Sequence, residues 1–204
     1  MSTGWCNPFG AKSNVKNLCP FKWRGTQGGL QLLCTFFKMK PVLISIHGPM
    51  AVGKSTICSH LYNKLKDYVF VDKAYIKDTM LKRLKKTDRE KAKEIANKVT
   101  VYMLEQVIPL QKHILLQEMR YFTIQKHVGD LLKKNNYRVV SFYLECSVEE
   151  AKKRDFVRIN GQSRPGLIEE MHAKHGFKDP QDIVINTEEN DVEQTVSLIL
   201  REIK

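Results

Sequence analysis

The sequence lacks any run of about eighteen apolar residues, so no segment is predicted to cross a membrane as a helix. Its five cysteines include no C-x-x-C pair, which argues against a structural zinc site. A disulfide framework is typical of small secreted proteins, so we interpret these cysteines as reduced thiols of a cytoplasmic protein. The six histidines have neither metal-ligand nor catalytic-triad spacing, and we assign them no chemistry.

Acidic residues are missing from residues 1–38, although this stretch contains five lysines and arginines. The stretch is rich in glycine, asparagine, proline and lysine, and it shows neither the period of a strand nor that of a helix. We therefore predict a disordered or spurious leader over 1–38 and a folded domain over 39–204. An organelle transit peptide is the alternative, but the stretch has a single arginine and no long amphipathic helix.

The whole chain carries a net charge of +12, which favours anionic partners such as nucleotides, nucleic acid or phosphorylated metabolites. From Met39 onward, apolar runs typical of buried strands alternate with amphipathic segments typical of helices. This alternation predicts an α/β domain with a parallel sheet and right-handed crossovers. The predicted strands are residues 41–47, 68–71, 113–118, 138–146 and 182–186. The predicted helices are residues 54–66, 73–86, a segment from a capping box at Thr87 to Pro109, 124–134, a segment from a capping box at Ser147 to about Ile159, and 192–203.

The stretch GPMAVGKST, residues 48–56, lies between the first predicted strand and the first predicted helix. It contains the P-loop pattern Gly48-x-x-x-x-Gly53-Lys54-Ser55, in which glycines let backbone N–H groups wrap around phosphate oxygens. The positive end of the following helix adds to this anion site. We expect Lys54 to reach the β- and γ-phosphates of ATP and the Ser55 hydroxyl to bind Mg²⁺. The nucleotide contacts expected from this loop are Gly48, Ala51, Val52, Gly53, Lys54, Ser55 and Thr56.

Two later segments add a family resemblance. CSVEEAKKRDFVR, after the fourth predicted strand, resembles the arginine-bearing lid of the small P-loop kinases, and DIVINTEENDVEQTVSLIL resembles their last strand and helix. This group of AAA-type ATP-binding proteins includes adenylylsulfate kinase, chloramphenicol phosphotransferase, zeta-toxin-like kinases and polynucleotide kinase, and the resemblance covers about residues 40–204. It implies a P-loop NTPase fold, with a five-stranded parallel sheet in the order 2-3-1-4-5 flanked by helices. It also implies transfer of the γ-phosphoryl group of a nucleoside triphosphate to a small acceptor.

Other P-loop classes fit the sequence less well. A GTPase normally carries N-K-x-D and D-x-x-G motifs, and neither occurs here. The glycine-rich signature of ABC-type ATPases is also absent, and an AAA+ motor needs a helical second domain for which the chain has no room.

Three arginines are candidate ligands of the transferring phosphoryl group. Arg154 and Arg158 are four residues apart on one face of a predicted helix, and Arg164 follows in a predicted loop. Guanidinium groups that close over the phosphates stabilise the charge of the transition state, so we expect Arg154 and Arg158 to act in catalysis and Arg154 and Arg164 to contact the nucleotide. The alternative for Arg154 is a salt bridge with Glu150 on a solvated helix face.

Two carboxylates end predicted strands at the edge of the sheet where ligands bind in open α/β folds. In the resembled kinases an aspartate at the place of Asp72 orients the acceptor hydroxyl, and we expect Asp72 to act as its general base. The alternative is that Asp72 only caps helix 73–86. Glu118 is expected to hold Mg²⁺ through water or to act as the base, and a salt bridge with Arg120 is its alternative. Tyr75 stands where the family pattern has an arginine.

The favoured hypothesis is an ATP- and Mg²⁺-dependent kinase that acts on a small anionic or hydroxyl-bearing acceptor, which the sequence does not identify. One alternative is a kinase for nucleic-acid ends, which the basic run over residues 82–86 permits. Another is a nucleotide-binding regulator without catalysis, because Tyr75 and Gln117 depart from the family pattern.

Overall fold

The fold described is that of the unit Met39–Lys204. The computed structural model describes residues 40–119, 121–157, 166–175 and 178–204, so the predicted leader lies outside the described residues. At the centre of the domain is a five-stranded sheet in the order β2-β3-β1-β4-β5, with every neighbouring pair parallel. This confirms the predicted fold class and strand order. The strands are β1 Val42–His47, β2 Tyr68–Asp72, β3 His113–Gln117, β4 Arg138–Glu145 and β5 Ile183–Asn186.

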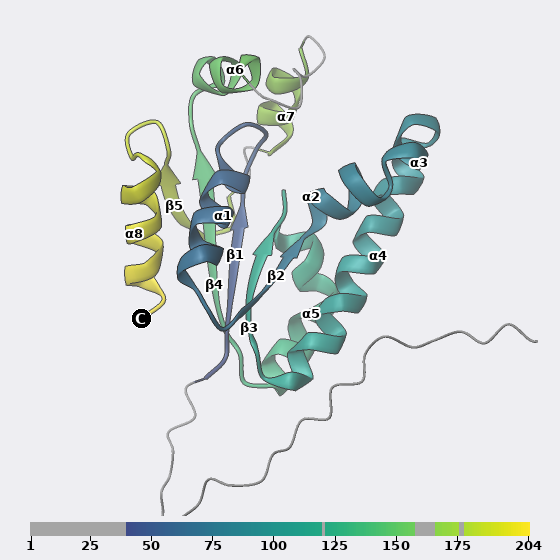
Figure 1. Ribbon diagram of the computed structural model, residues 1–204, viewed down its shortest axis with the longest axis vertical. Coiled ribbons are helices and arrows are strands. Elements are labelled where there is room, and N and C mark those ends of the chain that lie inside the picture. The colour runs from purple at the N-terminus through teal and green to yellow at the C-terminus, as the bar shows by residue number, and fades with distance from the viewer. Residues whose placement is uncertain (1–39, 120, 158–165, 176–177) are drawn as a thin grey trace, which may run out of the picture. The chain divides into compact units, whose positions relative to one another are not determined.

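Strand β1 is buried along its whole length because helices cover both faces of the sheet. Its alternate residues point to opposite faces, so Ile44 and Leu43 belong to two different core clusters. Helices α1 (Lys54–Lys64) and α8 (Val192–Glu202) pack on the Ile44 face. Helices α4 (Arg89–Val107) and α5 (Tyr121–Lys134) cover the Leu43 face (Figure 1). None of the helices in these described ranges is long and apolar enough to cross a bilayer.

The single helix predicted over residues 73–86 is wrong. The chain forms α2 (Lys73–Tyr75), a π-helical turn η1 (Ile76–Met80) and α3 (Lys82–Thr87) instead. The Leu81 N–H donates to the Ile76 carbonyl, 3.0 Å away, which closes a wider ring than an α-helix has. This wide turn buries Ile76 and leaves Met80 exposed, so the segment does not keep one helical period.

The predicted capping boxes are only partly correct. Asp88, not Thr87, caps α4 by accepting a hydrogen bond from the Lys91 N–H (2.9 Å), and a lysine at that position cannot complete a box. Ser147 caps α6 (Val148–Phe156) as expected, but its own N–H donates to Glu188. Helix α6 ends at Phe156, whereas the predicted end, Ile159, lies outside the described residues. Pro109 follows α4 in a short 3₁₀ turn, η2 (Ile108–Leu110), as expected of a helix-ending proline.

The sequence analysis missed one helix, α7 (Leu167–His175), which follows α6 beyond the P-loop end of the sheet (Figure 1). Its Leu167 and Ile168 are buried. The segment is short, and it lies close to the glycine- and proline-containing stretch that indicated a loop.

Candidate functional site

The P-loop follows β1 and wraps back on itself before α1 begins. Gly48, Ala51 and Gly53 have positive φ angles of 135°, 63° and 94°. Glycine is required at Gly48, because a Cβ there would lie 2.2 Å from the carbonyl oxygen of Leu144 in β4. Gly53 is the N-cap of α1, so the loop ends at the positive end of that helix. A glycine-containing turn that leads into the N-terminus of a helix is a backbone arrangement that favours anion binding.

The Lys54 side chain turns back into this loop. Its Nζ donates to the carbonyl oxygen of Gly48 at 3.0 Å and also to that of Pro49. The Lys54 ammonium group thus lies at the loop where we expect it to contact a phosphate. Thr56 is exposed on the first turn of α1, next to Ser55.

A hydrogen-bonded line joins the P-loop to the neighbouring strands. Gln117, at the end of β3, donates from Nε2 to Ser55 Oγ at 3.0 Å and to Asp72 Oδ1 at 3.4 Å. This line forms because Asp72 and Gln117 are paired in register at the ends of β2 and β3. Gln117 is buried, and its Oε1 has no hydrogen-bond partner among the described residues. Gln117 therefore links Ser55, which was expected to serve the nucleotide, to Asp72, which was expected to serve the acceptor.

Asp72 also caps α2, because its Oδ1 accepts a hydrogen bond from the Tyr75 N–H at 3.1 Å. The alternative role considered from the sequence is therefore present. Burial raises the pKa of Asp72, and the backbone N–H groups of Tyr75 and Ala74 act in the opposite direction. A carboxylate with a raised pKa is better suited to accept a proton, so the cap and the base are compatible.

Glu118 directly follows β3, and its N–H donates to the Ile46 carbonyl oxygen of β1 at 3.2 Å. Its buried side chain pairs with Lys73, whose Nζ is 3.3 Å from Glu118 Oε2. Burial raises the pKa of Glu118 to about 7, although the charge of Lys73 lowers it. Arg120, the salt-bridge partner considered from the sequence, lies outside the described residues.

Hard oxygen ligands for a cation such as Mg²⁺ are present at this edge. Ser55 Oγ is hydrogen-bonded to Gln117. Gln117 Oε1 and Glu118 Oε1 are both buried and have no hydrogen-bond partner among the described residues. The described residues contain no group of three histidine, cysteine or acidic side chains that could hold a metal alone. A site of this kind fits Mg²⁺, which retains water ligands and is commonly bound with substrate phosphates.

Arg154 of α6 reaches the P-loop. A Cβ placed on Gly53 would lie 4.0 Å from its Nη1. Arg154 donates to Glu150 at 2.9 Å, so the salt bridge considered as the alternative from the sequence is present. Arg154 also donates to Thr187 Oγ1 at 2.9 Å and to the Thr187 carbonyl oxygen at 2.7 Å. Arg158 and Arg164 lie outside the described residues.

Two contacts to the P-loop were missed by the sequence analysis. Thr187, directly after β5, has its Oγ1 3.0 Å from the carbonyl oxygen of Val52. His172 of α7 has its Nε2 2.9 Å from the carbonyl oxygen of Met50. Thr187 could have been found, because it follows a predicted strand at the same edge as Asp72. His172 gave no signal, since its helix was not predicted.

A buried Ser-His-Asp group next to the loop does not have the geometry of a catalytic triad. His47 Nε2 is 3.0 Å from Ser141 Oγ and 2.8 Å from Asp182 Oδ1, so one ring nitrogen contacts both partners. A triad relay needs the two ring nitrogens to face different partners. Burial lowers the pKa of His47, which favours the neutral ring.

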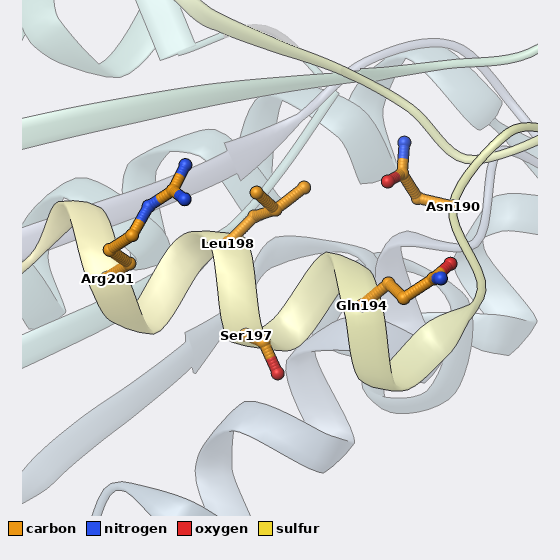
Figure 2. A pocket seen from close by; sticks show the side chains of 5 residues that line it. All are labelled: Asn190, Gln194, Ser197, Leu198 and Arg201. Carbon is orange, nitrogen blue, oxygen red and sulfur yellow. The ribbon is translucent and has the colours of Figure 1, made fainter.

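A surface hollow along α8 is separate from these residues. Figure 2 shows the side chains that line it, and none of them belongs to the P-loop or to the ends of β2 and β3. They are Asn190, Gln194, Ser197, Leu198 and Arg201.

Comparison with known proteins gives matches in both sequence and fold. Residues 44–165 match the family described as "AAA domain". The adenylyl-sulfate kinase of Staphylococcus epidermidis is 35% identical over 80 residues, which are 38% of this chain and 39% of that protein. The match thus spans well under half of that relative. The fold is similar to a sugar kinase from Janibacter sp. HTCC2649 (TM-score 0.62, 12% identity, 80% of this chain and 94% of the other). It is also similar to a gluconokinase from Sinorhizobium meliloti (TM-score 0.58, 11% identity, 80% and 96%).

Proposed function

The chain belongs to the AAA domain family, and from this we propose that it is an ATP- and Mg²⁺-dependent kinase that phosphorylates a small-molecule acceptor. Its kinase-like P-loop fold and its sequence similarity to an adenylyl-sulfate kinase support this proposal. The observation that carries it is the line from Ser55 through Gln117 to Asp72, which joins the nucleotide loop to a carboxylate on the neighbouring strand.

Each side chain of this line has a distinct task in the proposed reaction. Lys54 leaves the loop carbonyl groups to bind the β- and γ-phosphates, and Ser55 ligates the cation that accompanies them. Mg²⁺, when bound, neutralises part of the phosphate charge. Gln117 holds Ser55 and Asp72 in a fixed relation, and Glu118 would provide a further oxygen to help hold the cation.

The acceptor side is assigned to Asp72. Its carboxylate accepts the proton of the acceptor hydroxyl while that oxygen attacks the γ-phosphorus, and the bond from the γ-phosphorus to the β,γ-bridging oxygen breaks so that ADP leaves. Arg154, which lies over Gly53, stabilises the charge on the transferring group, and we extend this role to Arg158 and Arg164.

The test is a comparison of Lys54→Ala with Lys64→Ala, an exposed lysine at the other end of α1. We expect Lys54→Ala to weaken ATP binding in the presence of Mg²⁺ and to abolish turnover without unfolding the protein, because Lys54 serves phosphates rather than the core. Lys64→Ala should behave like the wild type. Calorimetry and ATP turnover against a panel of acceptors measure both properties. Equal ATP affinity in the two variants would contradict the nucleotide site, and ATP binding without any turnover would favour the regulator.

A further inference from the structure

Two lysines that follow Asp72 in the chain are more deeply buried than lysines usually are. The Lys73 side chain is 17% exposed and that of Lys77 is 23% exposed. Lys73 directly follows Asp72 in α2, and Lys77 lies in η1, the next element. Since ammonium groups normally stay in water, two of them withdrawn beside a ligand-binding edge require anionic compensation.

Neighbouring carboxylates provide this compensation only in part. Lys73 Nζ is 3.3 Å from Glu118 Oε2, which is longer than the usual charge-assisted hydrogen bond. Asp78 Oδ1 is 3.6 Å from Lys77 Nζ but 2.7 Å from Lys85 Nζ, so two cations share one carboxylate.

The electrostatic surroundings of Lys77 are mostly positive. Burial lowers its pKa, the charges of Lys85, Arg89 and Lys73 lower it further, and Asp78 acts against them. Three cations and one carboxylate therefore act on this ammonium group. An anion bound at Lys77 would relieve the repulsion and replace the water that the group has lost.

The backbone supports a functional interpretation of this segment. Lys73 and Lys77 lie close enough for the charge of Lys73 to lower the pKa of Lys77. The π-helical turn η1, which contains Lys77, is a rare conformation that occurs frequently at functional sites.

We propose that Lys73 and Lys77 bind a negatively charged oxyanion of the acceptor, such as a phosphate, sulfate or carboxylate group, beside the hydroxyl that Asp72 deprotonates. Glu118 and Asp78 hold the two lysines until the acceptor replaces them. The proposal rests on the proposed kinase function, and it restricts the acceptor to anionic molecules.

Inorganic phosphate is the probe for this site in the full chain. The protein is first saturated with Mg²⁺ and AMPPNP, a non-hydrolysable ATP analogue, so that the P-loop is already filled. Phosphate is then titrated at constant ionic strength, kept with NaCl because salt screens exposed charges. We expect the Tm to rise with phosphate and not with chloride, because a ligand of the native state stabilises it.

Substitutions identify the residues involved. In Lys77→Gln and Lys73→Gln, the phosphate concentration needed for the same rise in Tm should increase at least about tenfold, since each loses one charge-assisted contact. Lys98→Gln removes an exposed lysine of α4 and is the matched control, which should respond like the wild type. Glu118→Gln should respond at lower phosphate concentration, because it removes the carboxylate that competes for Lys73.

The outcomes separate this site from the kinase function. AMPPNP binding is measured first by calorimetry, and its absence contradicts both proposals. A protein that binds AMPPNP but shows no phosphate-specific rise in Tm contradicts only the oxyanion site. An equal loss of the response in Lys98→Gln also overturns it. If Lys77→Gln does not fold, Lys73→Gln and Glu118→Gln decide the question by their opposite expected shifts.

Discussion

Asp72 makes two contacts with one oxygen, and these contacts link helix geometry to chemistry. Its Oδ1 accepts a hydrogen bond from the Tyr75 N–H at 3.1 Å and lies 3.4 Å from Gln117 Nε2. Burial raises the pKa of the carboxyl group, which brings it closer to the range useful for proton transfer. A substitution that keeps the cap and removes the basic oxygen can therefore separate the two roles.

Asp72→Asn is such a substitution, because asparagine caps helices about as well as aspartate does. We expect nearly normal AMPPNP binding and a phosphotransfer rate lower by roughly 10²–10⁴, the usual contribution of a positioned general base. Asp88→Asn makes the same change at the exposed cap of α4 and is the control. The measurement is single-turnover transfer to an acceptor found in the turnover panel. A wild-type rate in Asp72→Asn would leave Asp72 as a cap only and direct the search for the base to Glu118.

At the scale of elements, the P-loop is held by segments that are distant in sequence. Thr187 after β5 contacts Val52, and the Arg154 guanidinium of α6 donates to both the Oγ1 and the carbonyl oxygen of Thr187. The Thr187 N–H also donates to the Glu145 carbonyl oxygen at 2.8 Å, which fixes it at the end of β4. Helix α6 and the nucleotide loop are therefore joined through one buried threonine.

Thr187→Val tests this junction. The variant keeps the shape of the side chain but removes the hydroxyl, so we expect a loss of about 1–2 kcal/mol in the free energy of unfolding. We also expect weaker AMPPNP binding, because the Val52 carbonyl and the Arg154 guanidinium lose a shared partner. Thr100→Val is the matched control, since the buried Thr100 hydroxyl donates to Ala96 within α4. Urea unfolding and calorimetry should show a stability loss in both variants and an affinity loss only in Thr187→Val. Equal affinities would show that the junction does not act on the loop.

At the scale of the whole molecule, the two apolar clusters that cover the sheet draw their buried residues from positions 42 to 199. Buried residues begin at Pro41, directly after Lys40 and just before β1. One cluster combines strands with helices α1 and α8, and the other combines strands with helices α4 and α5. Residues of this domain therefore cover both faces of the sheet.

A shortened chain that begins at Met39 should therefore keep the Tm and the AMPPNP affinity of the full chain. The absence of acids and of periodicity before Lys38 predicts the same result. Thermal unfolding and calorimetry of the two chains, compared at equal ionic strength, check it. A Tm lower by several degrees, or a weaker affinity, would mean that residues 1–38 contribute to the domain.

The sequence by itself determined the P-loop, the five strands, their order through the family resemblance, and most of the helices. The P-loop, the strands and the helices depend on residues a few positions apart, so local spacing is enough to reveal them, whereas the strand order was implied only by the family resemblance. The sequence analysis was wrong about a single helix over residues 73–86, because the π-helical turn Ile76–Met80 interrupts the helix.

Only the tertiary structure decided which side chains meet. Thr187 and Val52 are 135 residues apart, Gln117 and Ser55 are 62 apart, and their contacts depend on strand register and on the crossing of helices. The same holds for Glu118, whose contact with Lys73 joins the ends of the neighbouring strands β2 and β3 and was not predicted from the sequence. Local patterns fix which residues form an element, whereas the packing of elements fixes the distances between them, and chemistry at the site depends on those distances.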